Sequence, residues 1–443
     1  MLKMRKMKDS GIEWIGEIPE GWEIVPVRSC FDEVRTKNTD GQEQNALQFK
    51  SGNIISKTNF NASMDDYVAD TITNYTVVLP DTVMINGLNL NYDFKSLRVA
   101  LVKEKGVITS AYLAIFPDRK KISPQYATYL FKGYETKMAF HNMGAGIRKT
   151  LGYKEFKNQP LLLPSEKEQN KISAYLDSKC SHIDIMLSKI RSSIEEYKKL
   201  KQAVITQTVT KGVRGEREMK DSGNPWFGQI PTDWKLSRVG LHFSIILGKM
   251  LCNAPLNDTY TLEPYYCAAD VHFDGVADGE RKKMWFSPIE KDLYRVSVGD
   301  LLVVEGGAGA GGSAIVENQD SYTYIQNSIM IVRSKGNTDN RYLRYLLEFL
   351  VKQGYIDIVC NKATIPHFTK DKLSCVPFCL CPAGEQKEIA DYLDSKCAEI
   401  DGLIAKKEQL VKELESYKKS LIYEVVTGKR EIFTDITRKF PNI

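Results

Sequence analysis

The sequence contains one stretch twice: MKDSGIEWIGEIPEGW at residues 7–22 and MKDSGNPWFGQIPTDW at residues 219–234, an offset of 212. A second pair, EQNKISAYLDSKCSHID at residues 168–184 and EQKEIADYLDSKCAEID at residues 385–401, has an offset of 217. The segments between these shared stretches differ. Because a period above about 200 residues is far longer than a solenoid repeat, we interpret the chain as an internal duplication of a whole domain with its following linker.

Each copy of the second stretch predicts a long helix, because apolar residues recur three or four positions apart in a pattern close to a heptad repeat. A helix of about 40 to 45 residues is about 60 to 65 Å long and must bury such a stripe. The two stripes contain Ile172, Leu176, Ile183, Leu187, Ile190, Ile194, Tyr197 and Val204 in the first copy and Ile389, Leu393, Ile400, Ile404, Val411, Leu414 and Leu421 in the second.

We therefore expect the two helices to pack on each other in the antiparallel sense, with a pseudo-two-fold relation between the halves. Several lysines interrupt the stripes, which indicates either a seam of limited stability or an edge that faces a partner. These lysines are Lys179, Lys201, Lys396, Lys407 and Lys418.

The segments before each helix predict a mixed α/β unit. Short β-branched runs such as DTVMI and DLLVV are punctuated by Gly, Asn and Asp, and helical patterns begin near Pro124 and Asn340. The predicted fold class is α+β: two similar mixed α/β domains separated by two long antiparallel helices that form a coiled-coil spacer. The predicted parts are domain 1 (1–164), helix 1 (165–212), domain 2 (213–382), helix 2 (383–430) and a tail (431–443).

Composition sets outer limits on the function. A chain of 443 residues is long enough for about two or three domains, and 61 Lys+Arg against 56 Asp+Glu permits an anionic partner without requiring one. The sequence has no signal peptide and no apolar run long enough for a membrane span, so we expect a cytoplasmic protein. The nine cysteines contain no zinc-binding pattern, and we expect them to be reduced.

The duplicated opening, DSGxxWxGxIPxxW, resembles the start of the target-recognition domains in type I restriction-modification specificity subunits. Further stretches are similar to the same family and follow its domain order over nearly the whole chain. They are GDLLVVEGGAG (299–309), QNSIMIVRS (326–334), KATIPHFTKDKL (362–373), GEQKEIADYLDSKCAEID (384–401) and YEVVTGK (423–429).

The resemblance implies a protein that binds double-stranded DNA with two recognition domains, each reading one half of a bipartite, asymmetric site. It implies that the helices set the half-site separation and dock two modification (methyltransferase) subunits, and that restriction/translocase subunits join the full complex. It implies no catalytic centre and no cofactor on this chain: S-adenosylmethionine would belong to the modification subunits, and ATP and Mg to the nuclease subunit.

The residues themselves give no support for catalysis. Gly307, Gly309 and Gly312 match G-x-G-x-x-G after a predicted strand, but the following residues favour β structure, whereas a nucleotide-binding loop needs a helix there. We therefore predict a turn or loop. Residues 158–161 (NQPL) only partly match the adenine-methyltransferase motif, and we expect them to lead into a strand. The five histidines are scattered, so no catalytic or metal set is predicted.

The candidate DNA contacts are two polar, partly basic clusters in the first half of the chain and a counterpart of the second cluster in the other half, because Asn, Thr, Lys and Arg side chains read base edges and bind phosphates. One alternative is a solvated basic loop, and another is that Asn86 and its neighbours cap turns. We expect Trp14, Trp22, Trp226 and Trp234 to pack in the scaffold, because they lie in the shared part. The candidate residues are Asn86, Asn89, Asn91, Lys95, Arg148, Lys149, Thr150, Tyr153, Lys154, Lys362, Thr364, His367, Thr369 and Lys370.

Two other classes of function are compatible with parts of the sequence. One is a two-headed coiled-coil scaffold that binds proteins and no nucleic acid, which the mild net charge permits. The other is a stand-alone methyltransferase or nuclease, which would need a cofactor loop followed by a helix or a carboxylate-rich core, and neither is visible in the sequence.

Overall fold

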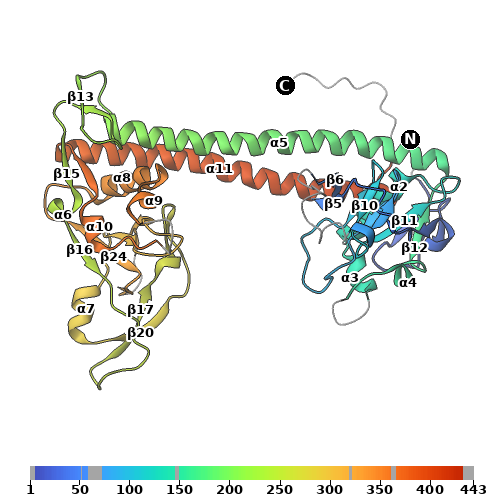
Figure 1. Ribbon diagram of the computed structural model, residues 1–443, viewed down its shortest axis with the longest axis horizontal. Coiled ribbons are helices and arrows are strands. Elements are labelled where there is room, and N and C mark those ends of the chain that lie inside the picture. The colour runs from blue at the N-terminus through green and yellow to red at the C-terminus, as the bar shows by residue number, and fades with distance from the viewer. Residues whose placement is uncertain are drawn as a thin grey trace. The chain divides into compact units, whose positions relative to one another are not determined.

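The computed structural model describes residues 5–50, 52–57, 72–144, 149–318, 322–360 and 366–432. The chain divides into two compact units (Figure 1). Unit 1 contains Met1–Arg191 and Glu408–Ile443, and unit 2 contains Ser192–Lys407. Two long helices, α5 (Glu166–Lys211) and α11 (Ala383–Val426), each contribute one part to unit 1 and the other part to unit 2. Both helices agree with the predicted helical segments.

Unit 1 is built around a four-stranded antiparallel sheet with the strand order β4-β11-β8-β9. Helix α2 (Pro124–Thr136) packs on strands β8 and β9. The strands of unit 1 are β1 (Met7–Asp9), β2 (Glu17–Pro19), β3 (Glu23–Pro26), β4 (Phe31–Glu33), β5 (Leu47–Lys50), β6 (Asn53–Ser56), β7 (Thr76–Val78), β8 (Val83–Ile85), β9 (Val99–Leu101), β10 (Gly106–Ile108), β11 (Leu113–Pro117) and β12 (Pro160–Leu163), and its short helices are η1 (Val27–Ser29), α3 (Ala139–Met143) and α4 (Tyr153–Phe156).

Unit 2 repeats this arrangement with a sheet of order β16-β24-β21-β22, again antiparallel throughout, covered by α8 (Asn340–Lys352). Its strands are β13 (Met219–Asp221), β14 (Gln229–Pro231), β15 (Lys235–Arg238), β16 (Phe243–Leu247), β17 (Thr261–Tyr266), β18 (Val271–His272), β19 (Gly275–Val276), β20 (Lys282–Phe286), β21 (Leu301–Val304), β22 (Ser313–Ile315), β23 (Tyr324–Ile325), β24 (Ile329–Ser334) and β25 (Pro377–Leu380), and its short helices are α6 (Val239–His242), η2 (Ala268–Asp270), α7 (Pro288–Tyr294), α9 (Tyr355–Val359) and α10 (Lys370–Ser374).

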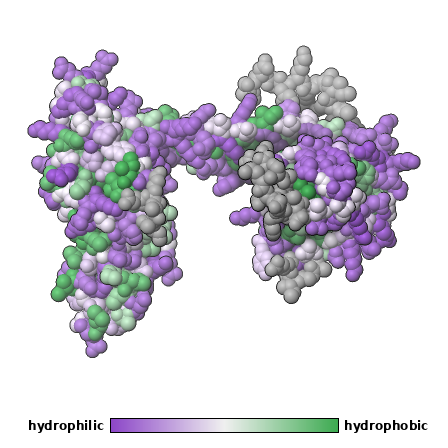
Figure 2. Space-filling model, viewed as in Figure 1, coloured by the Kyte–Doolittle hydropathy of each residue, from purple (hydrophilic) through white to green (hydrophobic). Residues whose placement is uncertain are grey.

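The units differ in their smaller sheets. Unit 2 has a three-stranded sheet, β20-β17-β23, with its own core of Tyr265, Met284, Phe286 and Tyr324, whereas unit 1 has the separate pairs β5-β6 and β10-β7. Exposed apolar side chains, among them Met250 and Ile289, lie near this sheet and α7, where green surface is visible in Figure 2. The duplicated frame therefore carries a part that differs between the copies.

Within each unit, the segments of α5 and α11 run antiparallel and share a buried seam. In unit 1, Lys418 contacts Asp184 at 2.6 Å, and in unit 2, Lys201 contacts Asp401 at 2.6 Å. The two ion pairs are copies of one another under the offset of 217, with the helices exchanged. Lys201 and Lys418 therefore join the helices instead of merely interrupting their apolar stripes. Lys407 also joins the two helices, because its Nζ lies 5.4 Å from the centroid of the Tyr197 ring in a cation–π contact.

The duplicated tryptophan and the duplicated glutamate contact each other in both units. In unit 1, Trp22 Nε1 donates to Glu168 Oε2 at 3.0 Å, and Arg5 pairs with the same carboxylate at 2.5 Å. In unit 2, Trp234 Nε1 donates to Glu385 Oε2 at 3.2 Å, and Arg217 pairs with that carboxylate. The opening stretch of each half is thus attached to the start of its long helix, which explains why both stretches appear twice.

The glutamine that follows each of these glutamates attaches the same helix to the rest of its unit. Gln169 accepts a hydrogen bond from Ser123 N at 2.8 Å, and Gln386 accepts one from Asp339 N at 3.0 Å. Ser123 and Asp339 are the N-cap residues of α2 and α8. The Glu-Gln pair therefore holds both the opening stretch and the helix that covers the sheet.

The tryptophans pack in the scaffold, as predicted. Trp22 and Trp234 are almost completely buried, and Trp14 and Trp226 pack against the two main cores. None of the helices in the described ranges combines the length and apolarity needed to cross a bilayer.

Replacing Glu385 by Gln should destabilise the protein more than replacing Glu168 by Gln. Glu385 is fully buried between Arg217 and Trp234, so the change removes a buried charge from the partly buried Arg217 guanidinium and should lower the free energy of unfolding by about 3 kcal/mol. The Glu168 side chain is 27% exposed, and its loss should cost about 1 kcal/mol. Urea unfolding followed by tryptophan fluorescence measures both, and equal losses would contradict the difference in burial as the cause.

Candidate nucleic-acid interface

Two loops of different length occupy the same position in the two sheets. The β8–β9 loop is residues 86–98 and the β21–β22 loop is residues 305–312. The strands before them carry related sequences, DTVMING from Asp81 and DLLVVEG from Asp300. Strand β8 lies between β11 and β9, and β21 lies between β24 and β22, so the loops leave equivalent sheet edges. The polar loop of the first half and the glycine-rich motif of the second are therefore structural counterparts.

In unit 1 the two predicted clusters lie together. Leu151 N donates to Gly87 O at 2.9 Å, and Leu90 N donates to Lys149 O at 3.3 Å, so the segment before α4 lines the β8–β9 loop. A Cβ on Gly87 would lie 2.4 Å from Leu151 O, and only glycine permits this approach. Five of the predicted side chains are exposed on this surface: Asn89, Lys95, Lys149, Thr150 and Lys154.

The other predicted residues of unit 1 either are partly buried in contacts within the protein or lie outside the described residues. Asn86 Oδ1 accepts from Leu88 N at 3.2 Å, which is the turn-capping alternative, and the half-buried Tyr153 donates its hydroxyl to Phe31 O at 2.7 Å. Asn91 is half-buried in the same loop, and Arg148 lies outside the described residues.

Unit 2 brings its segment before α10 to the glycine-rich loop in the same way. His367 forms a β-bridge with Gly306, and Gly307 N donates to Pro366 O at 3.1 Å. His367 and Lys370 are exposed, whereas Thr369 caps α10 through Lys372 N. Lys362 and Thr364 lie outside the described residues.

The glycine-rich motif is a loop between two strands, as predicted. Strand β22 follows it directly, so no helix N-terminus is available there for a phosphate. Gly307 and Gly311 have φ of +83° and +82°, which side chains rarely adopt. Within the described ranges, no group of three or more His, Cys, Asp and Glu residues could hold a metal ion. The NQPL segment leads into β12, also as predicted.

Arg98 supports the β8–β9 loop from inside. Its side chain is 1% exposed, and Nη1 donates to Asn86 O at 2.8 Å and to Leu88 O at 2.9 Å. Its guanidinium also lies 3.7 Å from the Asp93 carboxylate. Sequence reasoning missed the role of this arginine, because only its position next to a buried strand hinted at burial.

Glu135 of α2 fixes the end of the same loop. Its carboxylate accepts from Arg98 N at 2.5 Å. Burial raises the pKa of Glu135 to about 7, and the hydrogen bond from Arg98 opposes this increase. The loop is therefore connected to a carboxyl group that titrates near neutral pH.

Comparisons with known proteins agree on one family. Residues 232–413 match the model of the type I restriction modification DNA specificity domain. The chain is 26% identical to a protein of Methanocaldococcus jannaschii provisionally named the type I restriction enzyme MjaX specificity subunit, over 95% of this chain and 96% of that protein. It is 23% identical to the type I restriction enzyme MjaVIII specificity subunit of the same organism, over 93% of each.

Over nearly its whole length, this chain is similar to type I restriction enzyme specificity subunits. Its fold is also that of solved structures. A chain from a structure on complex assembly and conformational transition of the type I R-M system matches with a TM-score of 0.69 at 16% identity, covering 93% of this chain and 99% of that one. The HsdS subunit from Thermoanaerobacter tengcongensis matches with a TM-score of 0.51 at 17% identity, covering 93% and 98%.

A Gly87→Ala substitution should disturb the loop of unit 1, whereas Gly306→Ala should be tolerated. The new Cβ would meet the Leu151 carbonyl at 2.4 Å in the first case and only His367 Nδ1 at 3.4 Å in the second. We expect a loss of about 2 kcal/mol for the first and less than about 0.5 kcal/mol for the second. Hydrogen exchange at the Leu151 amide and urea unfolding measure both effects; unchanged exchange in the first variant would contradict the contact.

Glu135 should make the stability of unit 1 depend on pH. Because its folded pKa of about 7 lies above the ordinary value of 4.5, its contribution is complete below pH 4.5 and is lost as the pH rises through 7. Glu135→Gln keeps an acceptor for Arg98 N without a titrating group. The free energy of unfolding of the wild type, relative to this variant, should fall by roughly 3 kcal/mol between pH 4.5 and 7. Parallel curves for the two proteins would show that Glu135 titrates normally.

Proposed function

We propose that this chain selects the DNA sequence for a type I restriction-modification complex, with each unit reading one half of a bipartite, asymmetric site. The observation that carries the proposal is the pair of loops at equivalent sheet edges. The frame around them is the same in both units, while the loops differ in length and in side chains. A shared frame with different loops is what two different half-sites would require.

The exposed side chains at these edges have the chemistry for DNA contacts. Asn89 and Thr150 can hydrogen-bond to base edges, whereas Lys95, Lys149 and Lys154 can pair with phosphates. In unit 2, His367 and Lys370 would act beside the glycine-rich loop, where the absence of side chains lets a phosphate approach the main chain. We also assign Asn86, Asn91, Tyr153 and Thr369 to this interface, as residues that position it.

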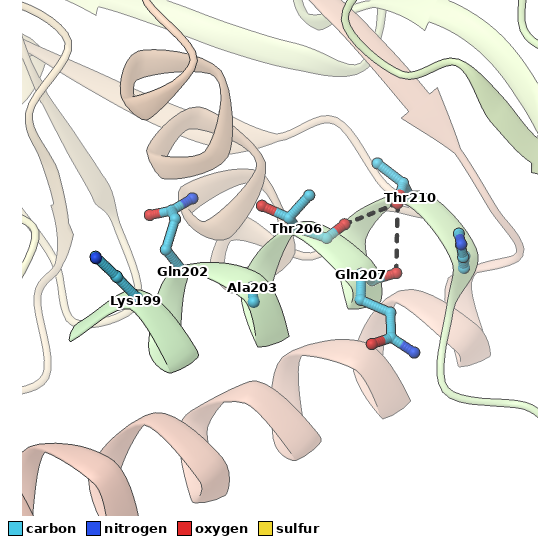
Figure 3. Close-up of a pocket in the computed structure, with 7 residues that line it drawn as sticks. Lys199, Gln202, Ala203, Thr206, Gln207 and Thr210 are labelled. Atoms are coloured by element: carbon cyan, nitrogen blue, oxygen red, sulfur yellow. Dashed lines mark hydrogen bonds between the residues drawn. The ribbon is translucent and has the colours of Figure 1, made fainter. Parts of the chain in front are cut away.

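We further propose that α5 and α11 dock two modification subunits. Apolar side chains remain exposed on both helices at repeated positions: Met186 corresponds to Leu403, and Leu200 corresponds to Tyr417, all between 36% and 48% exposed. In unit 2, α5 also lines an open groove of about 500 Å³ (Figure 3). Its residues are Lys199, Gln202, Ala203, Thr206, Gln207, Thr210 and Lys211.

Methyl transfer and DNA cleavage would be carried out by the partner subunits. The modification subunits would use S-adenosylmethionine, and the restriction subunits would use ATP and Mg. The chain itself would act in the cytoplasm as a non-catalytic subunit. The alternative, a two-headed protein scaffold that binds no DNA, is compatible with the exposed apolar residues of the helices. It does not account for the exposed polar side chains of the loops.

Mapping of methylated sites across a genome tests the proposal. A host with the modification subunit should gain methylation at a bipartite site only when this chain is present. Exchanging residues 40–140 for those of another family member should change one half of the site and leave the other intact. Four residues inserted after both Ser192 and Lys407 would add about 6 Å to each helix and should lengthen the spacer by about two base pairs.

Each outcome separates the alternatives. The scaffold function predicts no sequence-dependent methylation in any host. A spacer that stays constant while a half-site changes in the insertion variant would contradict the role of the helices and leave the role of the loops intact.

A further inference from the structure

The β8–β9 loop exposes two aromatic side chains on a fixed backbone. Tyr92 is 76% exposed and Phe94 is 57% exposed, although Leu90 and Arg98 on either side of them are buried. Aromatic side chains bring a large apolar surface, and a pair of them displayed on one polar loop suggests a binding role.

The loop backbone is held by contacts from several directions. Asn86 N donates to Arg98 O at 2.8 Å and closes the loop at its base. Asp93 Oδ1 accepts from Lys95 N at 3.1 Å and from Ser96 N at 3.0 Å, which folds the tip into a turn. Hydrogen bonds from Ser96 are the main reason that the pKa of Asp93 lies at about 2, so this carboxylate stays ionised at all physiological pH values. The tip is therefore ordered before any ligand binds.

The two rings differ in their surroundings. Phe94 stacks on His141 with centroids 5.1 Å apart and an interplanar angle of 12°, so one face of its ring is covered and its orientation is set. The Tyr92 main chain is held by a hydrogen bond from its N–H to Asn89 O at 3.1 Å, while its side chain extends into solvent. One ring is braced by the protein, and the other is available to a ligand.

The equivalent loop of unit 2 cannot present anything similar. Residues 305–312 read EGGAGAGG, so no side chain beyond Glu305 is larger than a methyl group. The two units therefore offer different surfaces at the same sheet edge: aromatic rings with Lys95 in unit 1, and main chain in unit 2.

We propose that Tyr92 and Phe94 form a wedge that enters a base step of duplex DNA, so that unit 1 reads part of its half-site by how easily that step opens. This inference rests on the proposed function. Apolar side chains that enter a base step unstack it and kink the duplex, and aromatic faces stack on the exposed bases. Lys95 lies three residues from Tyr92 and would pair with a neighbouring phosphate. Pyrimidine–purine steps deform most easily, so the wedge favours such a step in this half-site.

Arg98 is a positioning residue for this wedge. Its guanidinium is buried beneath the loop, and it holds the carbonyl groups at the base of the wedge. An Arg98→Lys variant keeps the charge but cannot bind the same set of carbonyl groups. Base-step opening should therefore decrease in this variant, whereas its binding to non-specific duplex at equal salt should stay unchanged.

The test uses the chain in complex with its modification subunit and a duplex that contains its mapped site. The fluorescent base 2-aminopurine replaces one base at a time across both half-sites. The wild type should produce a several-fold rise in fluorescence at one step of the unit 1 half-site and none in the other half. The Tyr92→Ala and Phe94→Ala variants should lose this signal and bind about tenfold more weakly. Tyr92→Phe should retain both, because it keeps the ring.

Leu79→Ala is the matched control, because Leu79 is 49% exposed in the same unit but lies outside the loop, and it should behave as the wild type. Specific binding without opening at any step would overturn the wedge and leave the proposed function intact. Loss of modification-subunit binding in the Tyr92→Ala variant, with DNA opening unchanged, would overturn the wedge and indicate that the two rings form a protein-docking site. A complex that binds no duplex specifically would overturn both proposals.

Discussion

The start of each long helix is the point on which the rest of the structure depends. A carboxylate there, fully buried at Glu385 and largely buried at Glu168, receives the indole N–H of a tryptophan from the opening stretch and a guanidinium beside it. A buried charge is tolerated only when such partners surround it. The next residue, Gln169 or Gln386, binds the N-cap of the helix over the sheet. Two adjacent side chains thus fix three elements of each unit.

This local arrangement explains the distribution of similarity along the chain. Residues that join the elements of a unit recur in both halves, whereas the loop after β8 or β21 does not take part in these contacts. The same logic applies to the helix seam, where Lys201–Asp401 and Asp184–Lys418 repeat one ion pair with the helices exchanged. The side chains that make these contacts are therefore the same in both halves, whereas the loops, which make none of them, differ between the halves.

The two long helices and their apolar stripes could be predicted from the sequence, because an apolar period near 3.5 over more than about forty residues is typical of long paired helices. The glycine-rich motif could be predicted to be a loop, because β-forming residues follow it. The match between the β8–β9 loop and the β21–β22 loop could not be predicted. The two share only short buried strands that many sequences can form, and the loops differ by five residues. The burial of Arg98 was not predicted because it depends on carbonyl groups that converge only in three dimensions.

The closed base of these loops has a consequence for engineering. Asn86 and Arg98 are joined by a main-chain hydrogen bond, and Val304 N donates to Gly312 O at 2.8 Å at the corresponding place in unit 2. Most of the segment between these ends is free to vary, but Leu90 in unit 1 and Ala310 in unit 2 are buried in the main cores. A protein engineer could therefore graft foreign segments of various lengths onto either edge, provided that each insert keeps a small or apolar residue at the one position that fills the hydrophobic core.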